Sequence, residues 1–86
     1  MNFANDSIKF DVYVDAKGLK CPLPILRAKK ALSQMQSGQI LRIITTDINA
    51  SNDFRIFSKQ TDNVIISQNQ YIIDNLEVVE HLIKKR

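Results

Sequence analysis

Cys21 is the residue of this chain whose type and setting most favour chemistry. It is the only cysteine, and it lies between Gly18 and the two prolines of the sequence, Pro22 and Pro24. Glycine permits the backbone angles of a tight loop, and proline is tolerated in the first turn of a helix. A proline also biases the residue before it toward extended geometry, which suits a capping position. The sequence therefore predicts a loop that ends at Cys21 and a helix that begins at Pro22.

A thiol in that position is predicted to be reactive. The N-terminus of a helix carries partial positive charge, and Lys20 is the adjacent residue. Both features favour the thiolate, and they predict that the pKa of Cys21 lies one or more units below about 8.5. A thiolate is a nucleophile, whereas most lone cysteines are small buried hydrophobes. The neighbouring prolines, glycine and lysine favour a reactive cysteine over a structural one.

The segment from Asp15 to Ile25, which reads Asp-Ala-Lys-Gly-Leu-Lys-Cys-Pro-Leu-Pro-Ile, resembles the signature of the TusA/SirA-like sulfur-carrier family. The hallmark of that family is Cys-Pro-x-Pro at the start of the first helix, preceded by a Gly-Leu loop. The resemblance extends from about residue 12 to the C-terminus. It implies a fold, an activity and a set of partners, which are treated below as expectations.

A second match to the family lies near residue 50. Asp47, Ala50 and Asp53 fit its Asp-Pro-x-Ala-x-x-Asp pattern. Phe57 fits a later aromatic position, and Ile48 stands where the family usually has proline. The two aspartates are interpreted as residues of a helix start, because carboxylates there suit the helix dipole. No chemical role is assigned to them.

The resemblance implies a sulfur carrier or sulfurtransferase that works through a cysteine persulfide. Cys21 would attack a persulfide on a cysteine desulfurase or a rhodanese-like protein, hold the sulfur, and pass it to the next protein of a relay. Family members serve thiolation of tRNA, molybdenum-cofactor synthesis or sulfur oxidation, so the donor, the acceptor and the pathway stay open. Persulfide exchange needs an exposed, activated sulfur rather than a deep cavity, and no cofactor is predicted.

The residues around the cysteine fall into two predicted groups. Those that position the thiol are Gly18, Lys20, Pro22 and Pro24. Those that dock a partner protein are Leu19, Leu23, Arg27 and Lys30. The net charge is +3, and six cations but no acidic residue lie between Asp15 and Asp47. This charge pattern predicts attraction to an acidic partner or to RNA, or simply a solvated helix face.

Two other classes of function remain open. A small basic RNA- or protein-binding regulator would explain the cations, although the aromatic content of 7% gives little stacking surface, so direct nucleic-acid binding is disfavoured. A cysteine redox switch is the third hypothesis, and it would need a thiol from another molecule because the chain has no second cysteine. The sequence favours the carrier, then the binding module, then the switch.

Length and composition bound the remaining choices. The 86 residues are 44% hydrophobic and 24% charged, which is typical of one small globular domain. No apolar run is long enough for a membrane span, and the first residues do not read as a signal peptide. A single free thiol is typical of the reducing cytoplasm, so a cytoplasmic protein with no membrane partner is predicted. His81 is the only histidine, so a structural role is favoured and no metal is predicted.

Hydrophobic periodicity predicts six elements in the order strand, helix, strand, helix, strand, strand. Strands are expected at residues 10–15, 39–46, 63–70 and 76–84, and helices at residues 22–36 and from within residues 47–54. The predicted fold is therefore an α/β two-layer sandwich, with two helices on one face of a mixed four-stranded sheet. Residues 1–9 are predicted to be a loose tail before a single domain at residues 10–86.

Local signals refine this picture. Gly38 is expected to end the first helix in the left-handed cap position, and Asp74-Asn75 is expected to turn the final hairpin. Residues 71–73 make that hairpin longer and more apolar than the family usually shows, as an extended ribbon or a contact patch. The pattern determines neither the strand order nor the oligomeric state, and the apolar second face of the sheet leaves room for a dimer.

Overall fold

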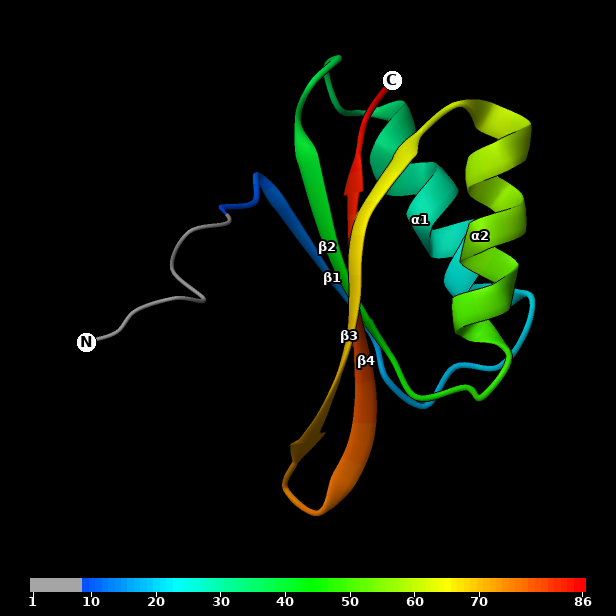
Figure 1. Cartoon of the computed structure of the whole chain (residues 1–86), viewed down its shortest axis with the longest axis vertical. Coiled ribbons are helices and arrows are strands. Elements are labelled where there is room, and N and C mark those ends of the chain that lie inside the picture. The colour runs from blue at the N-terminus through cyan, green and yellow to red at the C-terminus, as the bar shows by residue number, and fades with distance from the viewer. Residues whose placement is uncertain (1–8) are drawn as a thin grey trace.

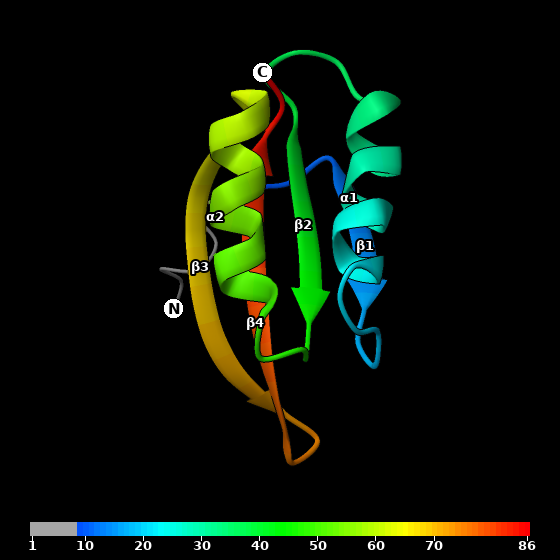
Figure 2. The ribbon, with the colours of Figure 1, turned by 90° about the vertical axis from the view of Figure 1, so that its right-hand side faces the viewer.

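Two helices cover one face of a four-stranded sheet (Figures 1 and 2). A computed structural model describes residues 9–86, so the predicted tail lies outside the described residues except for its last residue. The elements are β1 (Val12–Ala16), α1 (Leu23–Ser33), β2 (Ile40–Thr45), α2 (Ala50–Thr61), β3 (Val64–Ile73) and β4 (Leu76–Lys84). The predicted α/β architecture and element order are confirmed. Over these residues, no helix is both long and apolar enough to cross a membrane.

The strand order, which the sequence left open, is β1-β2-β4-β3. β1 and β2 are parallel, with Val14 opposite Ile43, whereas β4 is antiparallel to both of its neighbours. Parallel strands need a crossover connection, which α1 supplies. The carboxyl ends of β1 and β2 therefore meet at one end of the sheet, and the loops that follow them become neighbours. β1 and β3 are the two edge strands.

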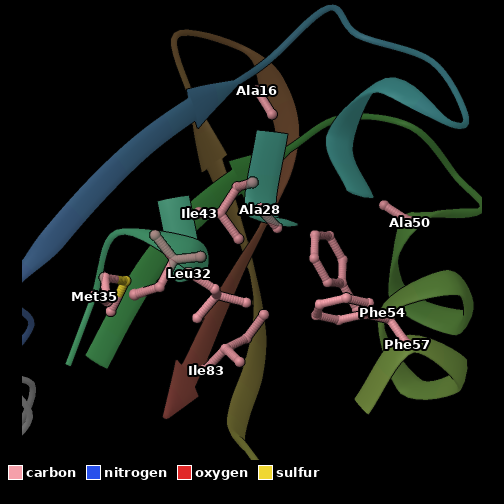
Figure 3. Close-up of a cluster of buried hydrophobic side chains, with 10 residues drawn as sticks. Ala16, Ala28, Leu32, Met35, Ile43, Ala50, Phe54, Phe57 and Ile83 are labelled. Carbon is pink, nitrogen blue, oxygen red and sulfur yellow. The ribbon is translucent and has the colours of Figure 1, made fainter. Parts of the chain in front are cut away.

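The core lies between the helices and the sheet (Figure 3). Ala28 and Leu32 of α1 are buried, as the predicted apolar stripe requires, and Ile43 of β2 is buried opposite them. From α2, Phe54 and Phe57 pack edge to face, with ring centroids 6.3 Å apart. A fully buried side chain such as that of Phe54 contributes roughly 2–3 kcal/mol of transfer free energy. These contacts hold both helices against the same face of the sheet.

Helix α1 begins one residue later than predicted. Pro22 is its cap residue rather than its first helical residue, and Pro24 is the proline that lies buried in the first turn. Cys21 therefore precedes the cap, so it lies outside the helix. This shift matters for the thiol, because the field of the helix dipole falls off within about one turn of the helix end.

Helix α1 also ends earlier than predicted, at Ser33 instead of residue 36. The amides of Gln34 and Met35 donate to carbonyls only three residues back, at 3.1 Å each, which tightens the last turn. Gly38 does have a positive φ of 90°, but it lies in the turn before β2, where its amide donates to the Lys85 carbonyl at 2.9 Å. The prediction that Gly38 caps α1 was wrong.

The β3–β4 hairpin extends beyond the rest of the sheet (Figure 1). Asp74 and Asn75 turn it with positive φ values of 51° and 66°, as predicted. β3 continues to Ile73, three residues further than predicted, whereas the pairing of β4 with β2 ends at Val79. Residues 71–78, called the distal ribbon below, therefore form a two-stranded extension.

The sheet face opposite the helices is not a bare apolar surface. Arg42 lies at its centre, with its guanidinium carbon 5.4 Å from the ring centre of Phe10 and 5.2 Å from that of Tyr13. Its Nε also pairs with the Glu80 carboxylate. The two rings of this cluster are exposed, whereas its ion pair is partly buried, and buried Ile44 lies on the same face.

His81 is a fully buried structural residue, as expected. Its Nδ1 accepts a hydrogen bond from the Gln68 amide group at 3.2 Å, so Nε2 carries the proton and donates to Thr45 Oγ1 at 2.8 Å. Its ring lies 4.6 Å from that of Phe54, centre to centre. Burial lowers the pKa of His81 to about 4, so the ring is neutral in the folded protein at neutral pH.

The stability of the fold should therefore fall as the pH drops through the range of His81. An unfolded histidine has a pKa near 6.5, so protons bind the unfolded state first. The contribution of neutral His81 to the free energy of unfolding should be complete above about pH 6.5. The free energy of unfolding should then fall by roughly 3 kcal/mol by about pH 4. Urea unfolding measured at about pH 7.5 and at about pH 5 would test this.

His81→Leu provides the control. That variant should be less stable at every pH, because Thr45 and Gln68 lose a buried hydrogen-bond partner, but it should lack the loss between about pH 6.5 and pH 5. Carboxylates titrate mainly below that window. A wild-type stability that stays flat across the window would contradict the burial of a neutral His81.

Candidate functional site

The loop at residues 17–22, called the Cys21 loop below, connects β1 to α1 at the carboxyl end of the parallel pair (Figure 2). Two residues that follow β2 hold it in place. Thr46 Oγ1 accepts a hydrogen bond from the Gly18 amide at 2.9 Å, and Asp47 Oδ2 accepts one from the Cys21 amide at 3.0 Å. The backbone of the cysteine is thus fixed by a carboxylate that lies 26 residues further along the chain.

Local geometry explains the residue types of the loop. Gly18 has a φ of 81°, and a Cβ at this position would meet no atom within 4 Å, so the backbone angle rather than crowding favours glycine. The amide of Leu19 donates to the Ala16 carbonyl at 3.2 Å, which closes the turn after β1. The peptide bond between Cys21 and Pro22 is cis. The positive φ of Gly18 is the feature of the loop that requires its residue type, and the positioning role of Pro22 stays a prediction.

The Cys21 thiol is exposed and faces acidic groups. A hydrogen bond to the Asp53 carboxylate raises the pKa of Cys21 most, and partial desolvation and the charges of Asp53 and Asp47 raise it further. The sequence had predicted a lowered pKa, and that prediction was wrong. At neutral pH the resting form of this cysteine is therefore the protonated thiol.

The raised pKa of Cys21 has a physical cause. Cys21 lies before the cap of α1, so the helix dipole acts on it less than predicted. Asp47 and Asp53 come from the loop before α2 and from its first turn, and the parallel pairing of β1 with β2 brings that region beside the thiol. The sequence has no acidic residue close to Cys21 on its C-terminal side, but the folded protein places two carboxylates beside the thiol.

The structure brings only some of the other predicted site residues close to Cys21. Lys20 and Leu23 are exposed next to the cysteine, whereas Leu19 is partly buried against the core. Arg27 and Lys30 are exposed further along α1, where they line a groove of about 450 Å³ between α1 and β1. Lys20 therefore lies beside the thiol, whereas Arg27 and Lys30 lie further away along α1.

Asp47 and Asp53 are site residues to which the sequence interpretation gave only a helix-start role. Asp53 does lie in the first turn of α2, but the side chain of the cap residue Asn49 makes no capping hydrogen bond. The signal that would have found both residues was their match to the family's aspartate pattern. Within residues 9–86, no three histidine, cysteine or acidic side chains are arranged to hold a metal ion.

Comparison with known proteins identifies the family of this chain. The family model described as Sulfurtransferase TusA matches residues 12–85. The chain belongs to the TusA family. The sulfur carrier protein TusA of Allochromatium vinosum is 52% identical over 61 residues, which cover 71% of this chain and 80% of that protein. A putative sulfur carrier protein of Neisseria meningitidis is 53% identical over 57 residues, covering 66% of this chain and 77% of that protein.

A third TusA relative and one solved structure complete the comparison. The putative sulfur carrier protein YrkI of Bacillus subtilis is 46% identical over 61 residues, covering 71% of this chain and 81% of that protein. The crystal structure of the SirA-like protein from Desulfitobacterium hafniense matches with a TM-score of 0.66 at 19% identity, over 88% of this chain and 100% of that one. The structural match confirms the fold, and the family supports a sulfur-carrier role in general.

Removal of the Asp53 charge should make Cys21 more reactive at neutral pH. In Asp53→Asn, the group that contributes most to the raised pKa becomes neutral, so the pKa of Cys21 should fall. Alkylation by iodoacetamide, followed by mass spectrometry across a pH series, should show a severalfold faster reaction near pH 7 and a midpoint at lower pH.

Asp62→Asn is the matched control. Asp62 is an exposed carboxylate at the C-cap of α2, and asparagine tolerates its left-handed φ of 64°. This variant should alkylate at the wild-type rate. An Asp53→Asn profile that coincides with the wild type, or that moves to higher pH, would show that Asp53 does not control the thiol.

Proposed function

We propose that the chain is a sulfur carrier that relays sulfane sulfur as a persulfide on Cys21. The observation that carries the proposal is the exposed thiol at the carboxyl end of the β1–β2 pair, in a loop that backbone hydrogen bonds to Thr46 and Asp47 hold in place. It is the only thiol of the chain, and relatives of the family carry the name sulfur carrier. An exposed thiol on a rigid end of the sheet can enter the active site of a partner enzyme.

The loading step is a thiol–persulfide exchange. The Cys21 sulfur attacks the terminal sulfur of a persulfide on the donor protein, and a new S–S bond forms between them. The S–S bond of the donor breaks, and the donor cysteine leaves as a thiolate. The proton of the Cys21 thiol passes to the neighbouring Asp53 carboxylate, the group that contributes most to its raised pKa. One sulfur atom moves, and no external oxidant or reductant is consumed.

The acidic surroundings keep the thiol of the free carrier protonated and therefore weakly reactive. A protonated thiol reacts slowly with free electrophiles and oxidants, because the thiolate is the nucleophile. This weighs against a redox switch, which requires a cysteine of low pKa. A donor that places a cation beside Asp53 and Asp47 would weaken their effect on the thiol, so the cysteine becomes activated where the sulfur is supplied.

The partners of the relay follow from this chemistry. The donor is a protein that bears a persulfide, such as a cysteine desulfurase or a rhodanese-like protein, and the acceptor is a downstream relay protein, in the cytoplasm. Thiolation of tRNA is one pathway that such a relay serves. Lys20 and Leu23 border the thiol and are the first residues that a docked partner meets. Arg27 and Lys30 extend this surface along α1.

Cys21 should accept one sulfur atom, and it should be the residue that does so. Incubation with a cysteine desulfurase and cysteine should add about 32 Da to the wild type, as intact-mass spectrometry can measure. Cys21→Ser should gain no mass. Its melting temperature should stay within about 8 °C of the wild type, because an exposed thiol contributes little packing. A wild type that remains unmodified with several desulfurases and rhodanese-like donors would contradict the proposal.

The cations of the Cys21 loop and α1 should govern the encounter with an acidic donor. Reversal of Lys20, Arg27 and Lys30 to glutamate should slow sulfur transfer at least tenfold, and added salt should slow the wild type. Reversal of Lys9, Lys59 and Lys84, which are exposed elsewhere, changes the net charge equally and should have a much smaller effect. Equal rates for the two triple variants, without salt dependence, would leave docking to the apolar residues Leu19 and Leu23.

A further inference from the structure

β3 is an edge strand with unusual composition and length. Its ten residues, Val64–Ile73, include no charged residue and no proline. The opposite edge strand, β1, has only five residues and carries Asp15, which is paired with Lys17. Edge strands are usually kept from pairing with other chains by short length, charges or proline. By these criteria β1 is protected and β3 is not.

The distal ribbon is the part of β3 and β4 that extends past the pairing with β2, and Val78 is its buried residue. Its exposed apolar side chains are those of Tyr71, Ile72, Ile73 and Leu76, with exposed fractions of 42%, 72%, 40% and 46%. An isolated two-stranded ribbon is marginally stable in water, and a third strand or a packed face is needed for stability. In the part of the chain that the structure describes, no third strand pairs with this ribbon.

The first half of β3, before the distal ribbon, is in contact with α2. Arg55 of α2 donates to the side chain of Gln68 at 2.9 Å, and Gln68 in turn donates to the Ser51 carbonyl at 3.0 Å. The register of β3 against β4 shifts between Ile65 and Ser67, as in a β-bulge. A bulge disrupts regular pairing, so it limits the regular open edge to the residues that follow it.

The geometry of the turn identifies the backbone groups on that open edge. Asp74 and Asn75 form a two-residue turn closed by Ile73 and Leu76, and such a closing pair is hydrogen-bonded. Because hydrogen-bonding direction alternates along an antiparallel strand, the N–H and C=O groups of every second residue point away from β4. Those residues are Gln68, Gln70 and Ile72.

We propose that a second copy of this chain pairs with β3 through this edge. An antiparallel arrangement with a two-fold axis at Gln70 places each Gln68 opposite Ile72 of the second copy. The outward backbone groups of both copies then satisfy one another, and the two sheets become one continuous sheet. A second copy is the occupant that the strand fits, because one two-fold contact satisfies two identical edges and the uncharged strand presents no like charges to itself.

The pairing does not depend on the proposed function. β3 and β1 lie at opposite edges of the sheet, and the Cys21 loop follows β1 (Figure 2). The dimer therefore leaves Cys21 of both copies open to a donor protein. The Arg42 cluster on the outer face takes no part, since its charges pair within one chain. The dimer of the sulfur carrier would present two Cys21 thiols, one on each copy.

Sedimentation equilibrium over loading concentrations from about 1 µM to about 1 mM tests the proposal. The mass of the wild type should rise from 9.9 kDa toward twice that value. Ile72→Lys places a charge on the open edge and should remain monomeric. Ile48→Lys is the matched control, because Ile48 is 92% exposed in the loop before α2, and it should dimerise like the wild type. Sulfur loading per chain should be the same in Ile72→Lys as in the wild type.

Amide hydrogen exchange of the wild type is an independent readout that needs no variant. The Gln70 and Ile72 amides should exchange more slowly as the protein concentration rises. A wild type that stays monomeric at every concentration, or an Ile72→Lys that still dimerises, would overturn the proposal. Protection of these amides that is absent, or that does not change with concentration, would overturn it too.

Discussion

The parallel pairing of β1 with β2 is the constraint on which the site depends. It places the ends of both strands side by side, so the Cys21 loop and the residues after β2 share one end of the sheet. The hydrogen bonds from Gly18 to Thr46 and from Cys21 to Asp47 follow directly from that adjacency. α1 makes the pairing possible, because it connects the two strands and buries its apolar stripe against them.

The same constraint determines the electrostatics of the thiol. The sequence places lysines and arginines near Cys21, and the tertiary structure adds Asp47 and Asp53, whose charges raise its pKa. The thiol therefore rests in its protonated form, which suits a carrier that should react with docked partners rather than with small oxidants. The cations lie along α1, where they can attract a partner protein without activating the cysteine in advance.

The fold separates two kinds of surface at opposite edges of the sheet. The β1 edge lies beside the Cys21 loop and is short and charged. The β3 edge is long and uncharged, and the distal ribbon extends it past the other strands. Between them, His81 links β4 through its ring nitrogens to Thr45 of β2 and Gln68 of β3. A buried neutral imidazole thus joins three strands beneath α2.

The sequence by itself determined the elements and the fold class, and it identified Cys21 as the candidate reactive residue. Apolar periodicity reports which face of a helix or strand is buried, so the stripe containing Ala28 and Leu32 could be predicted. The prolines and Gly18 report local backbone angles, so the loop before α1 could be predicted as well. Strand order and the pKa of Cys21 could not be predicted, because both depend on contacts between residues far apart in the chain. Asp53 reaches the thiol only after β1 and β2 pair, and this long-range contact raises the pKa of Cys21.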